Sequence, residues 1–424
     1  MLPIEQFTVS PQMLSIVGAI LILTIIGVST YFIIKNQRTL STPSNVAAIQ
    51  ASQLVAYEGL LGPFMKKSVV LTDFITGTPT VKGDPMTSEE KILVNFAPLT
   101  VLHPGFIGPL VNGVFSEKEG VKLALQIGAR CFVLPIDYHD EASFNEPLFP
   151  AAGQPCLLLR DAGGAVKSLN AGRIKKITQT IADLAFNSIT KGSTDPFILV
   201  LHFVKTPDSQ KNPKGFLKFC SQVAKELAPL TQYHLRQTPQ GSYTRQERQD
   251  QLLYMPLDQV EKKVLIFSNL DTSLFRTSSY KPNEDLDYWI NLRLFKESTN
   301  SLGLTQQANQ NQFVRGMIDT LSYYTTIPKD SVSAMVEKTK IRWSIALPVD
   351  KVSVADIKTA FVTVGVNSVP LLLATTDSTV LEHWRATTWV PKPKLLRFTP
   401  PQPVIPQTPS PKLNSNQGKI TAPK

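Results

Sequence analysis

The sequence predicts an α/β protein: a TIM-type (β/α)8 barrel, preceded by one N-terminal transmembrane helix and followed by a proline-rich disordered tail. Three observations predict this organisation. Apolar runs of strand length alternate with helical stretches between residues 90 and 398, an uncharged apolar segment lies near the N-terminus, and seven prolines fall within the last 26 residues. A doubly wound sheet is the alternative reading of the same strand and helix pattern.

The N-terminal region predicts a membrane anchor. Residues 1–12 form a short segment before residues 13–34, which contain no charged side chain. At about 1.5 Å per residue this stretch spans roughly 33 Å, enough for a hydrocarbon core of about 30 Å. A cleaved signal peptide would have a positive first region and a shorter apolar core, whereas Glu5 is the only charged residue before the stretch. Lys35 and Arg38 follow it, which places the C-terminal domain on the cytosolic side of a single-pass membrane protein.

Residues 35–89 are predicted to be a linker. Its part at 39–55 is polar and passes into a short helix, and residues 68–84 alternate in a way that indicates a hairpin around Gly77. The succession of apolar runs and helical stretches begins near residue 90, so the main domain is expected to begin there.

Composition restricts the possible partners. The chain carries a net charge of +10 and is 42% hydrophobic, so it can bury a substantial core. A basic surface near a membrane is attracted to anionic phospholipid headgroups. No Lys/Arg-rich run with interleaved aromatic residues indicates nucleic acid. The three cysteines, Cys131, Cys156 and Cys220, have no metal or disulfide spacing, as is typical of a reducing compartment.

The apolar runs between residues 90 and 398 predict a parallel sheet. Most are nearly continuous hydrophobics, which is typical of strands covered on both faces. They lie at 92–103, 130–137, 155–161, 196–204, 262–269, 342–349 and 368–376. Helical stretches lie between several of them, at 117–128, 171–190, 215–230 and 353–365. Repetition of strand and helix over this length favours one barrel domain at 90–398.

Residues 399–424 are predicted to form an extended, largely unfolded tail. The segment PQPVIP at 401–406 is suited to a polyproline II conformation that docks in an aromatic groove of a protein partner. An unstructured spacer is the equally open alternative.

Several segments resemble a known enzyme family. GVKLALQIGARCFVLPID at 120–137 resembles the X region of phosphatidylinositol-specific phospholipase C, where a helix leads into the second barrel strand. The likeness continues in register across most of 90–398. Its further segments lie at 155–186 (third strand, loop and helix), 195–203 (fourth strand), 256–269 and 364–384 (closing strand and loop). The resemblance implies the phosphodiesterase barrel fold.

The resemblance also implies a set of catalytic positions. Family members cleave a phosphodiester with one histidine as general base and another as general acid, and they stabilise the phosphoryl charge with calcium or an arginine. His103 ends the first strand and fits the first histidine. The second histidine falls at Arg160 or Asp161, the acidic ligand of the fourth strand aligns with His202, and the phosphate-binding lysine aligns with Phe267.

The calcium ligands implied by the family are largely missing. Pro104 stands where eukaryotic members have a metal-binding asparagine, and Val133 and Pro135 occupy the acidic positions of the second strand. Calcium takes six to eight oxygen ligands, and the site offers Asp137 and Asp161 at most. The sequence therefore predicts that the family's calcium site is lost and that no cofactor is used.

A replacement catalytic set can nevertheless be assembled from strand-end residues. His103 and His202 would form a new base and acid pair, with Arg160 supplying positive charge to the phosphate. The predicted substrate-binding residues beside this set are Asp137, His139 and Asp161.

Three functions follow from these observations. The leading prediction is a membrane-anchored phospholipase-C-like barrel that is catalytically degenerate and serves as a binding or scaffold module near lipid. The first alternative is an active phosphoric diester hydrolase that uses His103 and His202 on membrane lipids. The second is a viral structural protein that links a membrane to a protein shell.

Overall fold

The computed structural model describes residues 42–65, 85–142, 146–187, 192–235, 252–296 and 316–399, with positions 22, 24, 26, 144, 190, 298, 301–302 and 306–307. The expected transmembrane helix at 13–34, apart from three positions, the expected hairpin at 68–84 and the tail beyond Thr399 lie outside the described residues. Within the described part, no helix combines the length and apolar character needed to cross a membrane.

The core of the molecule is a curled parallel sheet. Seven strands follow the order β11-β10-β7-β6-β5-β3-β2, and each neighbouring pair is parallel. Their bounds are β2 Thr100–Leu102, β3 Cys131–Asp137, β5 Phe197–Phe203, β6 Val264–Ser268, β7 Leu292–Phe295, β10 Gly316–Thr320 and β11 Trp343–Leu347. A two-residue strand, β4 (Cys156–Leu157), pairs antiparallel with β3 off this path.

Residues 368–371 connect the two edges of this sheet. On one side, Leu371 N donates to Thr100 O at 2.9 Å and Leu102 N donates to Leu371 O at 2.9 Å. On the other side, Ala346 N donates to Ser368 O at 2.8 Å, and both bridges are parallel. The sheet therefore curls as in a (β/α)8-type barrel, and it is called the barrel below.

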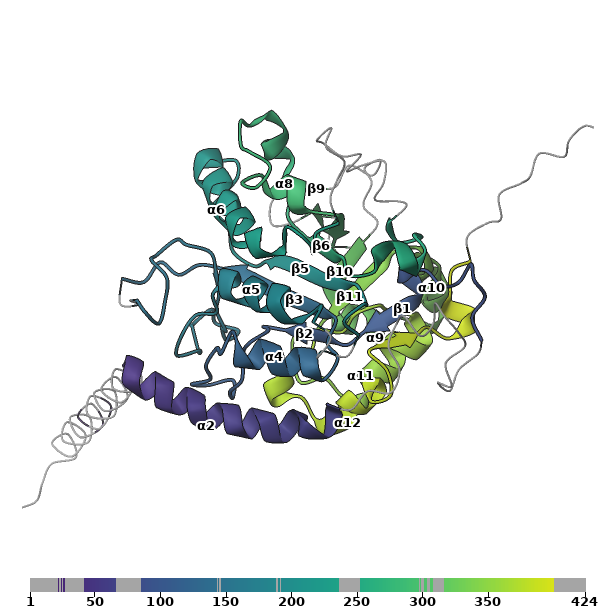
Figure 1. Cartoon of the computed structure of the whole chain (residues 1–424), viewed down its shortest axis with the longest axis horizontal. Helices are drawn as coiled ribbons and strands as arrows, with labels where there is room; N and C mark the ends of the chain where they lie inside the picture. The colour runs from purple at the N-terminus through teal and green to yellow at the C-terminus, as the bar shows by residue number, and fades with distance from the viewer. Residues whose placement is uncertain are drawn as a thin grey trace, which may run out of the picture.

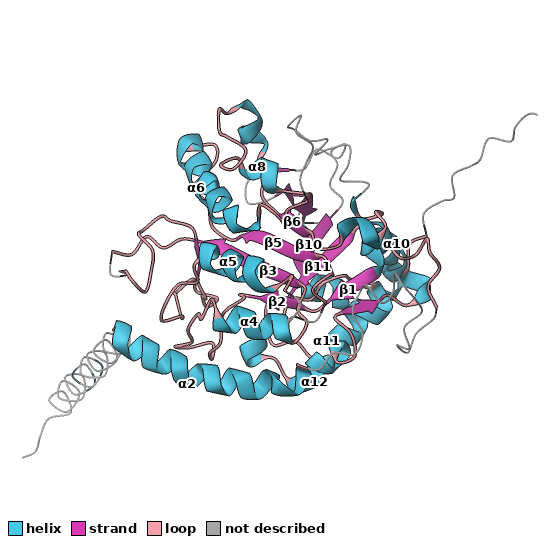
Figure 2. Cartoon of the chain, viewed as in Figure 1, coloured by secondary structure: helices cyan, strands magenta, loops and turns pink. Residues whose placement is uncertain are grey.

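Helices cover the outside of the barrel (Figures 1 and 2). They connect successive strands, as the parallel arrangement requires. Their bounds are α4 Glu119–Gln126, α5 Ile174–Leu184, α6 Pro213–Glu226, α8 Leu286–Trp289, α9 Leu321–Thr325, α10 Val332–Ile341, α11 Val354–Lys358 and α12 Ser378–Leu381. A six-residue π-helix at Thr359–Val364 follows α11, and the 19-residue helix α2 (Pro43–Leu61) lies along one side of the barrel.

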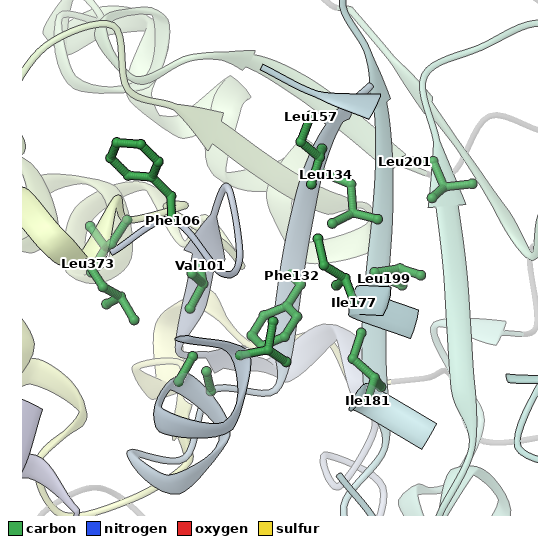
Figure 3. Packing of buried hydrophobic residues seen from close by; sticks show 14 of the residues in the cluster. Val101, Phe106, Phe132, Leu134, Leu157, Ile177, Ile181, Leu199, Leu201 and Leu373 are labelled. Atoms are coloured by element: carbon green, nitrogen blue, oxygen red, sulfur yellow. The ribbon is translucent and has the colours of Figure 1, made fainter. Parts of the chain in front are cut away.

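Alternation along the strands separates two buried layers. Phe132 and Leu134 of β3 and Leu199 of β5 face the helices and pack with Ile177 and Ile181 of α5 (Figure 3). The intervening residues of the same strands belong to a second cluster, which fills the barrel interior. Its strand members include Cys131, Val133, Ile198, Val200, Leu265, Phe267, Leu292 and Leu294. The side chains of a strand point alternately to its two faces. Every second residue of each strand therefore faces the barrel interior, and the residues between them face the helices.

The N-terminal end of the barrel is closed by the chain's entry and exit segments. Strands β1 (Phe96–Pro98) and β12 (Trp389–Pro391) pair antiparallel there. Nearby, Arg397 Nη1 lies 3.1 Å from Glu90 Oε2, and both side chains are buried. Asn95 holds the same junction, because its amide exchanges two hydrogen bonds of 2.8 Å with the backbone of Phe398.

The prediction of a barrel strand at residues 155–161 is wrong. Residues 155–161 contribute only β4, and the barrel instead uses β7 and β10, which the apolar pattern does not predict. Arg293 in β7 and Asp319 in β10 interrupt the hydrophobic run of each short strand. The apolar character of 155–161 has another cause, because Cys156 and Leu158 pack in a separate small cluster.

Candidate functional site

The C-terminal ends of the barrel strands carry most of the predicted site residues. Here we call the residues that follow these ends the C-terminal rim. His103 directly follows β2, and its backbone N donates to Val133 O at 3.2 Å. Its φ of 49° lies in the left-handed region, which histidine adopts more readily than most residues. The ring is buried, and its Nδ1 has no hydrogen-bond partner within the described part of the chain.

His202 lies on the interior face of β5. It follows Ile198 and Val200 at alternate positions, and both of these pack inside the barrel. Burial, together with the positive charge of Lys296, lowers the pKa of His202 to about 4. Burial likewise lowers the pKa of His103 to about 3, with a second contribution from His202. Both histidines therefore lie toward the C-terminal end of the barrel, and each is neutral near pH 7.

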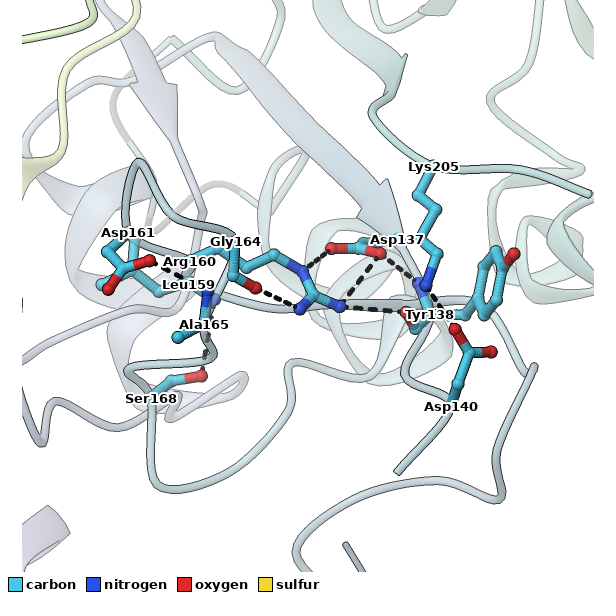
Figure 4. A network of polar contacts seen from close by, with 10 residues as sticks. All are labelled: Asp137, Tyr138, Asp140, Leu159, Arg160, Asp161, Gly164, Ala165, Ser168 and Lys205. Atoms are coloured by element: carbon cyan, nitrogen blue, oxygen red, sulfur yellow. Dashed lines mark hydrogen bonds and ion pairs between the residues drawn. The ribbon is translucent and has the colours of Figure 1, made fainter. Parts of the chain in front are cut away.

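Arg160 is engaged by Asp137 rather than exposed at the rim (Figure 4). Its Nε lies 2.5 Å from Asp137 Oδ2, and only 4% of the Asp137 side chain is exposed. The guanidinium also donates to Tyr138 O at 3.1 Å and to Gly164 O at 2.7 Å. The second carboxylate oxygen of Asp137 accepts from the Tyr138 backbone N at 2.6 Å. Asp137 and Arg160 are thus brought together, and the guanidinium is held by Asp137 and by two backbone carbonyls.

The other two predicted substrate-binding residues make contacts within loops. Asp161 pairs with Lys167 at 2.9 Å and accepts from Ala165 N at 2.9 Å, which fixes a tight turn. The Lys167 hydrogen bond lowers the pKa of Asp161. His139 is buried, its Nε2 lies 2.6 Å from Pro150 O, and its ring packs edge-on against Phe149. Neither contact set places these residues beside the two histidines.

The residues present do not fit the calcium ion that the family resemblance implies. On the interior face of β3, Val133 and Pro135 precede Asp137, and both Asp137 oxygens already accept hydrogen bonds. Across the described residues, no group of three or more His, Cys, Asp or Glu side chains is placed to hold a metal ion. Calcium would need six to eight oxygen ligands.

Lys296 is a rim residue that the sequence analysis missed. It follows β7, and the alternation Leu292, Leu294, Lys296 assigns it to the interior face of that strand. It is exposed, and its charge acts on His202. The signal was present in the sequence as this alternation, but β7 is too short and too interrupted to be recognised as a strand.

Comparison with known proteins gives one kind of match. No protein-family model and no curated protein sequence matches the chain. Several solved structures do. Phospholipases C are among the solved structures that the chain resembles. They include a calcium-dependent phosphoinositol-specific phospholipase C from Pseudomonas sp., with 12% identity and a TM-score of 0.41 over 73% of this chain and 98% of that one. The enzyme from Streptomyces antibioticus has 9% identity and a TM-score of 0.42 over 71% and 99%.

A third similar structure is L. pealei PLC21, with 16% identity and a TM-score of 0.49 over 73% of this chain. The chain spans only 38% of the length of that structure. The resemblance predicted from the sequence is thus found again among solved structures. At these identities and TM-scores the likeness says nothing about the activity of this chain.

Proposed function

We propose that the protein is a membrane-held barrel that binds a phosphate-bearing headgroup at its C-terminal rim without cleaving it. The observation that carries this proposal is the position of His103 after β2 and His202 near the end of β5, with His103 buried and its Nδ1 without a hydrogen-bond partner among the described residues. Burial lowers the pKa of both imidazoles, which keeps them neutral near pH 7. A neutral imidazole N–H donates a hydrogen bond to a phosphate oxygen, and Lys296 adds a positive charge beside it. These groups suit recognition of an anion.

The same features argue against turnover. A general acid must carry its proton at the operating pH, and a catalytic pKa near that pH is optimal. With pKa values of about 3 and 4, neither histidine is a protonated acid at pH 7. General acid–base help is worth about 10²–10⁴ in rate. Arg160 is held by Asp137, so the charge that would stabilise a developing phosphoryl anion is engaged elsewhere.

Membrane attachment is the second part of the proposal. It is supported by the uncharged apolar sequence at residues 13–34 and by Lys35 and Arg38 directly after it. In this arrangement the barrel lies on the cytosolic side, and the tail at 399–424 is available to a protein partner.

The test uses the full chain in detergent micelles and two readouts. With phosphatidylinositol vesicles and calcium, we expect no release of soluble inositol phosphate above the buffer control. With glycerophosphoinositol, a soluble phosphodiester, calorimetry should detect binding that Lys296→Met weakens about tenfold, as expected for loss of a charge-assisted hydrogen bond. Lys394→Met is the matched control, because Lys394 is exposed at the N-terminal end of the barrel. Equal binding by all three proteins would contradict the proposal.

An active diesterase is the second candidate, and it is supported by the positions of His103 and His202 at the C-terminal ends of β2 and β5. A bound phosphate would favour their protonated forms and raise both pKa values. Headgroup release by the native chain that His103→Ala abolishes would establish this candidate and overturn the first.

A further inference from the structure

The segment that follows His103 folds back on itself. We call residues 105–116, between β2 and α4, the His103 loop. Phe106 pairs antiparallel with Phe115, and Ile107 N donates to Val114 O at 3.0 Å. The rings of the two phenylalanines meet edge-on, with their centroids 5.2 Å apart. The loop is therefore a short hairpin, and its second arm at residues 112–115 returns toward His103.

Phe115 packs against the ring of His103. The two ring centroids are 6.0 Å apart with an angle of 60° between the planes, which is within the range of aromatic contact. His103 is only 8% exposed, and Phe115 is fully buried. The imidazole Nδ1 has no hydrogen-bond partner among the described residues. Exclusion of water from His103 therefore depends on where the second arm of the loop holds Phe115.

Two side-chain amides hold the second arm, one from α2 and one from the segment before α5. Gln53 of α2 donates to Asn112 O at 3.0 Å and accepts from Val114 N at 3.1 Å. Asn170 accepts from Phe115 N at 2.7 Å and donates to Phe115 O at 2.9 Å. Each amide satisfies one backbone donor and one backbone acceptor, as a neighbouring strand would in a sheet. The arm is therefore held at both of its ends by side chains from outside the loop.

The tip of the loop is closely packed around the amide of Gln53. A Cβ added at Gly108 would lie 2.0 Å from Gln53 Oε1 and 2.6 Å from the Cα of Gly113. A side chain there would displace the amide and break both of its hydrogen bonds. Glycine at position 108 therefore allows α2 to approach the loop.

Helix α2 provides a fixed base for Gln53. It lies along the outside of the barrel beside α4 (Figure 1). Its residues Val46, Tyr57 and Leu61 are buried and belong to the main hydrophobic cluster. Gln53 is 59 residues away from Asn112 along the chain. The contact therefore forms only when α2 is packed in place, so tertiary packing rather than local sequence fixes the loop.

We propose that Gln53 and Asn170 are positioning residues for His103. By holding the second arm of the loop, they keep Phe115 against the imidazole and keep water away from it. This inference deepens the proposed function and rests on it, because a dry, neutral imidazole is the group that donates to the phosphate there. Burial lowers the pKa of His103 more than the nearby His202 on β5 does. A looser loop therefore acts on the larger of the two causes.

The test measures how fast diethyl pyrocarbonate acylates His103 in the full chain, in detergent micelles at pH 7. The reagent attacks a neutral imidazole that solvent can reach, and peptide mass spectrometry assigns the modified histidine. Gln53→Met and Asn170→Leu preserve the approximate size of each side chain and remove its hydrogen bonds. We expect each to accelerate acylation of His103 about tenfold, as fits the loss of two hydrogen bonds from a loop that opens locally. The double variant should exceed both single variants.

Matched controls separate positioning from a general loss of stability. Gln50→Met makes the same substitution one turn earlier on α2, and Asn212→Leu removes the amide that caps α6. Neither should change the acylation of His103. His234, which is buried beside the first residue of β6, is the internal reference, because it reacts faster only when the whole domain loosens.

The outcomes for the loop and for ligand binding are read separately. Unchanged acylation of His103 in both Gln53→Met and Asn170→Leu overturns the inference, and so does equal acceleration at His103 and His234. Calorimetry with glycerophosphoinositol reports the proposed function. Absence of binding by the native chain contradicts that function, whereas the acylation rates, which need no ligand, still decide whether the two amides position His103.

Discussion

Replacing Arg160 with methionine removes the partner of a carboxylate that is almost completely buried. Asp137 has 4% of its side chain exposed and Arg160 has 23%, so leaving Asp137 without its partner costs more than leaving Arg160 without its partner. Removing one member of a buried pair costs about 3–5 kcal/mol. Because Arg160 is partly solvated, we expect Arg160→Met to lower the free energy of unfolding by about 3 kcal/mol, the lower end of that range.

The reverse substitution should cost less. Asp137→Asn leaves a guanidinium that reaches solvent and still donates to Gly164 O and Tyr138 O, so we expect a loss of about 1–2 kcal/mol. The double variant should lose less than the sum of the single losses, since it leaves no buried unpaired charge. Urea unfolding followed by tryptophan fluorescence measures all four proteins.

The same variants distinguish a structural arginine from a phosphate ligand. If Asp137 occupies Arg160, Arg160→Met lowers stability and leaves glycerophosphoinositol binding unchanged. If Arg160→Met keeps its stability within about 1 kcal/mol of the native protein and loses binding, the reasoning is refuted, and the sequence-based prediction of Arg160 as a catalytic charge gains support.

Three further predictions concern titrating groups. Burial lowers the pKa of Lys392 to about 7 from 10.5, so above pH 7 the unfolded chain holds the extra proton and stability rises with pH. Lys392→Met should lack about 1.5 kcal/mol of that rise between pH 7 and 8.5 in urea titrations, and parallel curves would contradict this. Burial lowers the pKa of His383 to about 4, so the free energy of unfolding falls as pH drops below 6.5. His383→Phe keeps the stacking on Phe361 and should retain about 2 kcal/mol more of its free energy of unfolding at pH 5. Equal acid sensitivity of the two proteins would exclude the effect. Lys296→Met should raise the pKa of His202, measured by NMR titration of the imidazole, and an unchanged titration would show that the two groups do not interact.

Much of the barrel could be predicted from the sequence because burial on both faces leaves a continuous apolar signal. Strands β3, β5, β6 and β11 lie within predicted runs, and α4, α5 and α6 lie within or overlap predicted helices. Strands β7 and β10 could not be found in this way. Each has four or five residues, and Arg293 and Asp319 take part in polar contacts outside the barrel interior. Hydrophobic runs report burial, and they report strand pairing only indirectly.

The position of two candidate site residues was predictable where it depends on strand ends. His103 follows β2 and His202 lies near the end of β5, as expected because parallel strands place their C-terminal ends at one edge of a barrel; their role stays a prediction. The pairing of Arg160 with Asp137 depends on the path of the long connection between β3 and α5, which no local pattern determines. Lys296 was missed together with the strand that positions it.

The junction at the N-terminal end of the barrel has a consequence for modularity. Arg397 donates to Glu90 and, at 3.2 Å, to the carbonyl of Pro85. The chain therefore enters and leaves the domain at neighbouring positions. Domains whose ends meet in this way tolerate insertion into other chains and circular permutation. The neighbouring positions of Pro85 and Arg397 therefore suit circular permutation of the domain, with helix α2 retained because Val46, Tyr57 and Leu61 are buried against the barrel.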